Sequence, residues 1–229
     1  MFSSTFTNLG EQSTPLSVLV FFLIAFVLPL VRLWLKTGNF AMAFSRNRDP
    51  IQKLVGAGIA IYMTGLCVWA ICYALLGKVA LGVWQTSIPV QAIGWVMLAI
   101  GLGTTVTAQA QMGTSWRMGV DPNPTGLITS GLFRFSRNPI YTGMLLTLYS
   151  YIFISPCPWL IMGCCQFTLL VYLQTVYEEQ ALIKEHDINY LSYASSVGRF
   201  FPNVGYLKSS QTNLNNTKVS SKVSSSITN

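Results

Sequence analysis

The apolar residues of this chain are concentrated in five blocks, each about as long as a lipid bilayer is thick. The blocks cover residues 15–35, 54–76, 88–108, 139–155 and 157–177 of the 229 residues. A helix of about 20 apolar residues crosses a hydrocarbon core that is roughly 30 Å thick. A soluble helical bundle needs a charged outer face on each helix, and only 9% of these residues are charged. We therefore predict an all-α, multi-pass membrane bundle of about five transmembrane helices.

The first block is expected to stay in the protein as an anchor. Residues 1–14 contain no basic residue, whereas a cleavable signal peptide begins with a positively charged region. The five cysteines all lie in or beside apolar blocks and show no Cys-x-x-Cys or Cys/His spacing. We expect them to pack as small hydrophobic side chains and predict no metal site.

The basic residues predict the topology. Loops 36–53 and 109–138 carry four and three lysines or arginines, whereas loop 77–87 carries one. Because cytoplasmic loops are enriched in Lys and Arg, we expect an outside N-terminus and a cytoplasmic C-terminus. This arrangement places Arg137 and the pair Glu178-Glu179 on the same, cytoplasmic, side. The basic residues are spread among loops rather than gathered on one helix face, so we expect no nucleic-acid partner.

Prolines and changes in composition along the chain predict four regions. Two prolines in Ser155-Pro156-Cys157-Pro158 predict a tight reversal between the last two spans. The amphipathic pattern of residues 178–196 predicts a helix that leaves the membrane along the cytoplasmic surface. The predicted regions are 1–53 (first anchor and basic loop), 54–108 (spans two and three), 109–202 (a polar segment, the hairpin and the amphipathic helix) and 203–229 (a disordered, Ser/Asn/Thr/Lys-rich tail).

Two polar features stand out in so apolar a chain. The segment 109–138 is rich in glycine, which lets backbone N–H groups approach a ligand, and contains Arg137, whose planar guanidinium suits a carboxylate or phosphate. Glu178 and Glu179 follow an apolar span, where acidic groups gain nothing from a helix C-terminus. If the helix continues past them, ribose hydroxyls, an amino group or Arg137 are candidate partners for these carboxylates.

The order of these residues resembles a known signature. Leu127–Phe133 is followed by Arg137–Gly143, then by Glu178-Glu179, and then by a Tyr/Val/Arg/Pro pattern that ends at Pro202. This order is similar to the C-terminal signature of the isoprenylcysteine carboxyl methyltransferase family and its phospholipid methyltransferase relatives. The resemblance covers residues 109–202 and includes neither of the first two spans. Three positions depart from the usual pattern: Thr125 and Asn138 each replace a His, and Gln174 replaces a frequent Arg.

The resemblance implies an integral membrane methyltransferase that uses S-adenosyl-L-methionine in a cytosolic pocket. Its acceptor would be a lipophilic small molecule or a lipidated substrate presented from the bilayer. The catalytic candidates are Arg137, Tyr141 and Arg199. Arg137 or Arg199 would anchor a carboxylate acceptor, whereas an amine acceptor must lose a proton, for which Glu178, Glu179 and Tyr141 are candidate relays. The implied cofactor-binding residues are Leu127, Ile128, Thr129, Gly131, Asn138, Pro139, Tyr141, Glu178 and Glu179.

Two other functions remain open at this point. Membrane sterol reductases share a similar Arg-His-Pro-x-Tyr-x-Gly element and use NADPH, although they are usually longer. A small transporter or membrane scaffold would need polar residues lining a path, and spans two and three offer only four threonines. Their glycines are expected to permit close helix packing instead. The methyl acceptor also stays open among prenylated cysteine, phosphatidylethanolamine and a small lipophilic thiol or acid.

Overall fold

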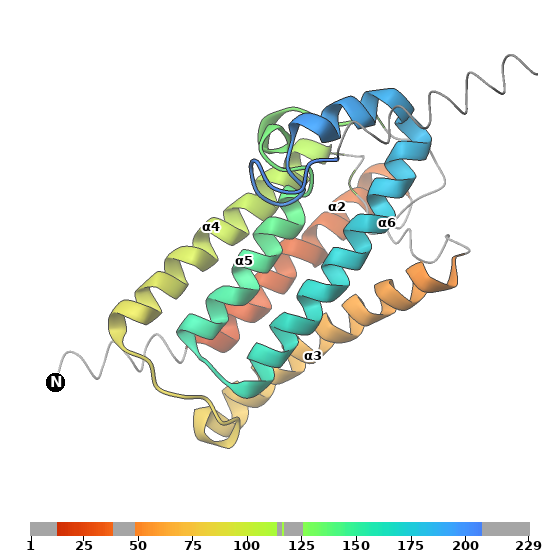
Figure 1. The fold of residues 1–229 in the computed structure, drawn as a ribbon. Coiled ribbons are helices and arrows are strands. Elements are labelled where there is room, and N and C mark those ends of the chain that lie inside the picture. Colours follow the sequence, from red (N-terminus) through yellow and green to blue (C-terminus); the bar gives the residue numbers. More distant parts are fainter. Residues whose placement is uncertain (1–12, 39–48, 114–115, 117–125, 208–229) are drawn as a thin grey trace, which may run out of the picture.

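Five apolar helices form the computed structural model, which describes residues 13–38, 49–113, 116 and 126–207 (Figure 1). The first helix begins at residue 13 and includes a π-helical turn, η1 (Leu23–Val27), and α2 (Leu28–Thr37). It is followed by α3 (Pro50–Ala80), α4 (Ile88–Met112), α5 (Pro139–Ile154) and α6 (Pro158–Ser196), with a short 3₁₀ turn, η4 (Gly131–Arg134), before α5.

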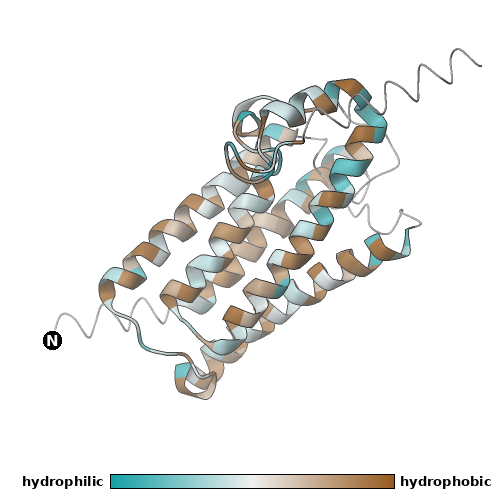
Figure 2. Cartoon of the chain, viewed as in Figure 1, coloured by the Kyte–Doolittle hydropathy of each residue, from teal (hydrophilic) through white to brown (hydrophobic). Residues whose placement is uncertain are grey.

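Four of these helices are long and apolar enough to cross a membrane, and α5 is a shorter apolar helix of 16 residues. The colouring in Figure 2 shows apolar residues along the length of the bundle. Where the chain is described it contains no strand. The predicted all-α membrane bundle is therefore confirmed.

Prolines determine where several helices begin. Pro50, Pro139 and Pro158 each occupy the first position of a helix, where the missing N–H costs no hydrogen bond. Asp49 caps α3 by accepting a hydrogen bond from the Ile51 N–H at 2.9 Å. The α5–α6 reversal lies at the predicted proline pair, and the Pro156 carbonyl accepts a hydrogen bond from the Trp84 N–H at 2.8 Å.

Helices α4 and α5 pack backbone against backbone. A Cβ atom on Gly101 would lie 2.7 Å from the Thr147 nitrogen, and one on Gly143 would lie 2.6 Å from the Gly101 carbonyl oxygen. Gly94 makes a similar approach to the carbonyl of Ser150, at 2.9 Å. Small residues allow this spacing in membranes, where dispersion contacts hold helices together. The expectation of close packing is confirmed for Gly94 and Gly101, whereas Gly103 faces open space.

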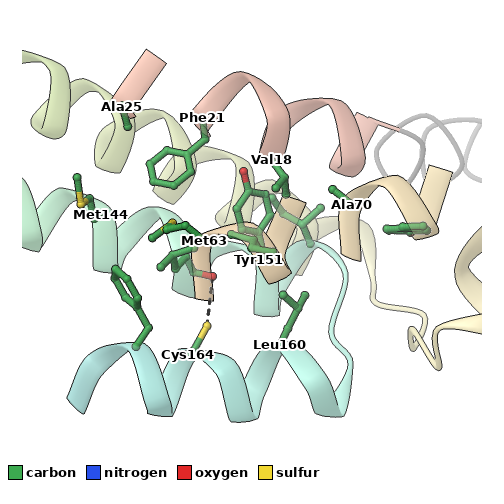
Figure 3. Packing of buried hydrophobic residues seen from close by; sticks show 14 of the residues in the cluster. Val18, Phe21, Ala25, Met63, Ala70, Met144, Tyr151, Leu160 and Cys164 are labelled. Carbon is green, nitrogen blue, oxygen red and sulfur yellow. Dashed lines mark hydrogen bonds between the residues drawn. The ribbon is translucent and has the colours of Figure 1, made fainter. Parts of the chain in front are cut away.

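The apolar core lies between the helices and involves all five of them. Its buried members include Phe21, Met63, Tyr151 and Leu160, which come from the first helix, α3, α5 and α6 (Figure 3). The Cys164 thiol donates a hydrogen bond to the Leu148 carbonyl across α5 and α6, at 3.6 Å. The core therefore fixes the position of α5 against α6, whose ends build the candidate site.

Helix α6 is longer than the predicted span and changes direction at one residue. Asp187 has φ 43° and ψ −119°, so the helix breaks there, and residues 188–196 run across the end of the bundle (Figure 1). The predicted 178–196 helix is thus two pieces, of which residues 178–186 continue the span. Residues 203–207, predicted as part of the tail, instead return to the bundle, where the Leu207 N–H donates to the Ala194 carbonyl at 3.1 Å. The tail beyond residue 207 lies outside the described residues.

Adding one methyl group to the α4–α5 contact should destabilise the protein. Gly101→Ala places a Cβ against the backbone of α5 and should lower the free energy of unfolding by about 1–3 kcal/mol. Gly103→Ala, two residues away on the same helix, meets no atom within 4 Å and should leave stability nearly unchanged. Thermal unfolding of both variants in the same detergent measures the difference. Equal effects of the two substitutions would contradict the packing described here.

Candidate functional site

A cavity lies at the end of the bundle where α5 begins and α6 leaves the apolar core. Its polar wall is formed by Arg137, Asn138, Tyr141 and Glu178. Apolar lining residues come from four helices: Phe26, Ile59, Met144 and Phe167. Residues 126–128 and several aromatic residues also line the cavity, the aromatic residues being Trp116, Phe133, Tyr190 and Tyr193. The cavity can therefore accommodate a molecule that has both polar and apolar parts.

Arg137 is held by protein groups through all of its side-chain donors. Its Nε and Nη2 donate to Oε1 of Glu179 at 3.0 and 2.6 Å. The remaining N–H groups donate to the backbone carbonyls of Ala194, Val197 and Gly205. A guanidinium has five N–H groups, and five hydrogen bonds are present. Arg137 contacts the cavity, but it has no donor left for a ligand.

Glu179 is clamped between two guanidiniums. Arg137 binds its Oε1, and Arg199 binds its Oε2 through Nη2 at 2.7 Å and through Nε at 3.1 Å. The side chains of Arg137 and Glu179 are 1% and 5% exposed, and that of Arg199 is 20% exposed. We call these three residues the Arg-Glu-Arg clasp. A buried carboxylate with two opposite charges is well compensated, whereas the loss of one partner leaves a buried charge.

The outer arginine of the clasp has a raised pKa. Partial burial opposes the charge of Arg199, but the hydrogen bonds and negative charge of Glu179 outweigh burial and lift the pKa above its ordinary value. The Arg199 guanidinium also lies over the Tyr172 ring, 5.4 Å from the centroid. Arg199 therefore remains charged at any physiological pH. It does not line the cavity.

The clasp ties together segments that are far apart in the sequence. The Arg137 N–H donates to the Gly198 carbonyl at 2.9 Å, and the Asn138 N–H donates to the Arg199 carbonyl at 3.1 Å. The Thr142 hydroxyl donates to the Phe200 carbonyl at 3.0 Å. The chain after α6 thus lies against the first turn of α5. A side chain at Gly198 would overlap the Phe201 carbonyl, so this approach requires glycine.

Glu178 points into the cavity instead. Its Oε1 accepts a hydrogen bond from the Tyr141 hydroxyl at 2.8 Å and another from the Gln174 amide at 2.9 Å. Its Oε2 has no donor among the described residues. Glu178 is thus oriented by two neutral side chains and keeps one carboxylate oxygen available to a ligand.

The segment before α5 is fixed by two side chains that the sequence analysis did not assign. Oε1 of Gln111 accepts a hydrogen bond from the Leu132 N–H at 2.9 Å, and the Tyr193 hydroxyl donates to the Phe133 carbonyl at 2.6 Å. Gly131 has φ 63°, and a Cβ there would lie 2.5 Å from the Gln111 amide. Glycine is therefore required at position 131 for its backbone conformation and for the approach of Gln111.

The predicted site residues are only partly brought together. Six of the nine implied cofactor-binding residues line the cavity: Leu127, Ile128, Asn138, Pro139, Tyr141 and Glu178. Thr129 and Gly131 lie outside the lining, and Glu179 belongs to the clasp. Of the three catalytic candidates, Arg137 and Tyr141 line the cavity and Arg199 does not. All of these roles remain predictions.

The sequence analysis also missed part of the lining. Phe26 and Ile59 come from the first two helices, which carry no motif, and no signal distinguishes them from other apolar residues. Two of the departures from the signature have defined contacts: Asn138 Nδ2 donates to the Arg199 carbonyl at 3.1 Å, and Gln174 donates to Glu178. Thr125, the third departure, lies outside the described residues.

Residues 90–187 match the model of the phospholipid methyltransferase family. This match confirms the family resemblance that the motifs predicted. The fold is also similar to the solved structure of the eukaryotic intramembrane Ras methyltransferase, isoprenylcysteine carboxyl methyltransferase, with a TM-score of 0.47 and 18% identity. The aligned region covers 70% of this chain and 56% of that protein. No curated protein matches the sequence.

The two adjacent glutamates should respond differently to the same neutralising substitution. Glu179→Gln leaves two guanidiniums without their buried counter-charge and should lower the free energy of unfolding by about 3–5 kcal/mol. Glu178→Gln removes no ion pair and should change stability by less than about 1 kcal/mol. Chemical or thermal unfolding of both variants in detergent provides the comparison. A Glu179→Gln variant as stable as Glu178→Gln would contradict the clasp.

Proposed function

We propose that this protein is an integral membrane methyltransferase that uses S-adenosyl-L-methionine and acts on a lipophilic acceptor. The observation that carries the proposal is the Glu178 carboxylate, which Tyr141 and Gln174 orient in a cavity whose lining is otherwise largely apolar and aromatic. The match of residues 90–187 to the phospholipid methyltransferase family supports the reaction type.

The lining residues fit the cofactor chemically. Besides its carboxylate, S-adenosyl-L-methionine carries an ammonium and two ribose hydroxyls, which donate well to a carboxylate, and a sulfonium, which interacts well with a carboxylate or a π face. Oε2 of Glu178 is available as an acceptor for the ammonium or the hydroxyls. Aromatic rings from Tyr141, Tyr190 and Tyr193 surround the same space. The residues present therefore suit a cationic ligand better than an anionic one.

The chain's own contribution is orientation and exclusion of water. Bound S-adenosyl-L-methionine would supply the activated methyl group. Glu178 and Asn138 would hold the polar part of the ligand, and Tyr141 would keep the Glu178 carboxylate in place through its 2.8 Å hydrogen bond. The clasp would position these groups without touching the ligand, because Arg137 has no free donor. Alignment of an acceptor with a methyl carbon removes several kcal/mol of an entropic barrier.

The apolar wall suggests how the acceptor would lie. Phe26, Ile59, Met144 and Phe167 give the cavity apolar surface against which an acyl or prenyl chain would be buried. The described lining contains no arginine or lysine with a free donor, so a carboxylate acceptor would lack a cationic anchor there. This favours an acceptor whose nucleophile is an amine or a thiol, such as the headgroup of a lipid, over a prenylcysteine carboxylate.

We propose that residues 109–202 form the catalytic region and that the first two helices supply part of the apolar lining of the cavity. We also propose that the cavity opens on the cytoplasmic side and that the N-terminus lies outside, which the distribution of basic residues among the loops supports.

Cofactor binding tests the proposal directly. Isothermal titration of the full chain in detergent should show saturable heat with S-adenosylhomocysteine and none with NADPH. Because a hydrogen bond to a charged group is worth about 1.5–3 kcal/mol, Glu178→Gln should weaken binding roughly 10- to 100-fold. Glu185→Gln, an exposed position farther along α6, is the matched control and should bind normally. Heat with NADPH alone would instead favour the reductase.

A further inference from the structure

A second cavity lies between α2 and α4, at the same end of the bundle as the candidate site. Its walls are largely apolar and include Leu28, Val31, Val106 and Ala110. Two basic residues, Arg32 and Lys36, line it near the C-terminal end of α2. We call this cavity the α2–α4 groove. The proposed methyl transfer makes no use of it.

The charges of the groove are of one sign. Arg32 and Lys36 lie four residues apart, so they project from the same face of α2. Within the part of the chain that the structure describes, neither has an acidic partner and no acidic residue lines the groove. Lys36 lies in the last turn of α2, where the helix leaves the apolar region of the chain. Two unpaired cations at the mouth of an apolar groove complement an anionic amphiphile.

A buried hydrogen bond holds one of the residues that line the groove. The Gln109 amide lines it and donates a hydrogen bond to the Ala25 carbonyl at 2.7 Å, which joins α4 to the π-helical turn η1. Gln109 is 7% exposed, so this bond is buried. Trp116, which is 4% exposed, lines both the groove and the candidate site. The groove therefore adjoins that site but has its own apolar walls and its own cations.

We propose that the α2–α4 groove binds one anionic phospholipid, with its phosphate between Arg32 and Lys36 and an acyl chain along the apolar wall. The apolar lining disfavours a small soluble anion, which would leave that wall exposed to water. The two cations favour an anionic headgroup over a zwitterionic one, because each basic residue near the membrane surface adds to the attraction of anionic lipid. This binding is independent of the identity of the methyl acceptor.

Native mass spectrometry of the full chain tests the proposal. The protein is released from micelles doped with equal amounts of phosphatidylglycerol and phosphatidylcholine. We expect one saturable phosphatidylglycerol adduct, with affinity at least fivefold above that of phosphatidylcholine. Arg32→Gln/Lys36→Gln should weaken phosphatidylglycerol binding roughly 10- to 30-fold. Lys53→Gln, an exposed cation at the start of α3, is the matched control and should bind as the wild type does.

A second variant tests the apolar half of the groove and guards against a folding defect in the double variant. Ala110→Trp fills the groove, leaves both cations in place and should also remove the adduct. Equal retention of the two lipids, or equal losses in Lys53→Gln and the double variant, would overturn the proposal. An adduct that survives Ala110→Trp would overturn it too, because binding would then be surface attraction alone. Binding of S-adenosylhomocysteine by these variants reports separately on the candidate site.

Discussion

The Arg-Glu-Arg clasp is the interaction on which the candidate site depends. Glu179 is a buried carboxylate, and charge in such a place persists only when it is paired and fully hydrogen-bonded. Arg137 and Arg199 meet both conditions, and Arg137 adds three backbone carbonyls as acceptors. One ion-pair network therefore joins the start of α5, the middle of α6 and the chain after α6. The cavity lies beside this junction and takes its shape from it.

Helical geometry explains why two adjacent glutamates have different surroundings. Neighbouring residues in an α-helix point roughly 100° apart, so Glu178 and Glu179 leave the helix in different directions. Glu179 points toward the clasp, while Glu178 points toward Tyr141 and the cavity. The two glutamates therefore have different roles. The charged network around Glu179 holds the junction in place, whereas the Glu178 carboxylate, bound only by neutral groups, remains available to a ligand. Arg137, the most conspicuous cation of the sequence motif, belongs to the first of these functions.

The hydrophobicity pattern of the sequence predicts much of the fold, but it does not predict much of the candidate site. Block length and the two prolines of the α5–α6 reversal predicted the helices, because bilayer thickness and a missing N–H act locally. The break at Asp187 has no glycine or proline to mark it, and it depends on how the chain returns over α5. The role of Arg137 in the clasp could not be predicted from the sequence either. Three of its acceptors are backbone carbonyls, which every residue has and which no sequence pattern marks. Phe26 reaches the cavity only through helix packing.

The most direct test of this account is an experimental structure of the full chain with S-adenosylhomocysteine bound in detergent or a nanodisc. We predict the ligand between α5 and α6, within hydrogen-bonding distance of Glu178, with the Arg137–Glu179 and Arg199–Glu179 contacts still 2.6–2.7 Å long. A ligand that displaces Glu179 from Arg137, or one bound away from Glu178 altogether, would contradict the proposed site.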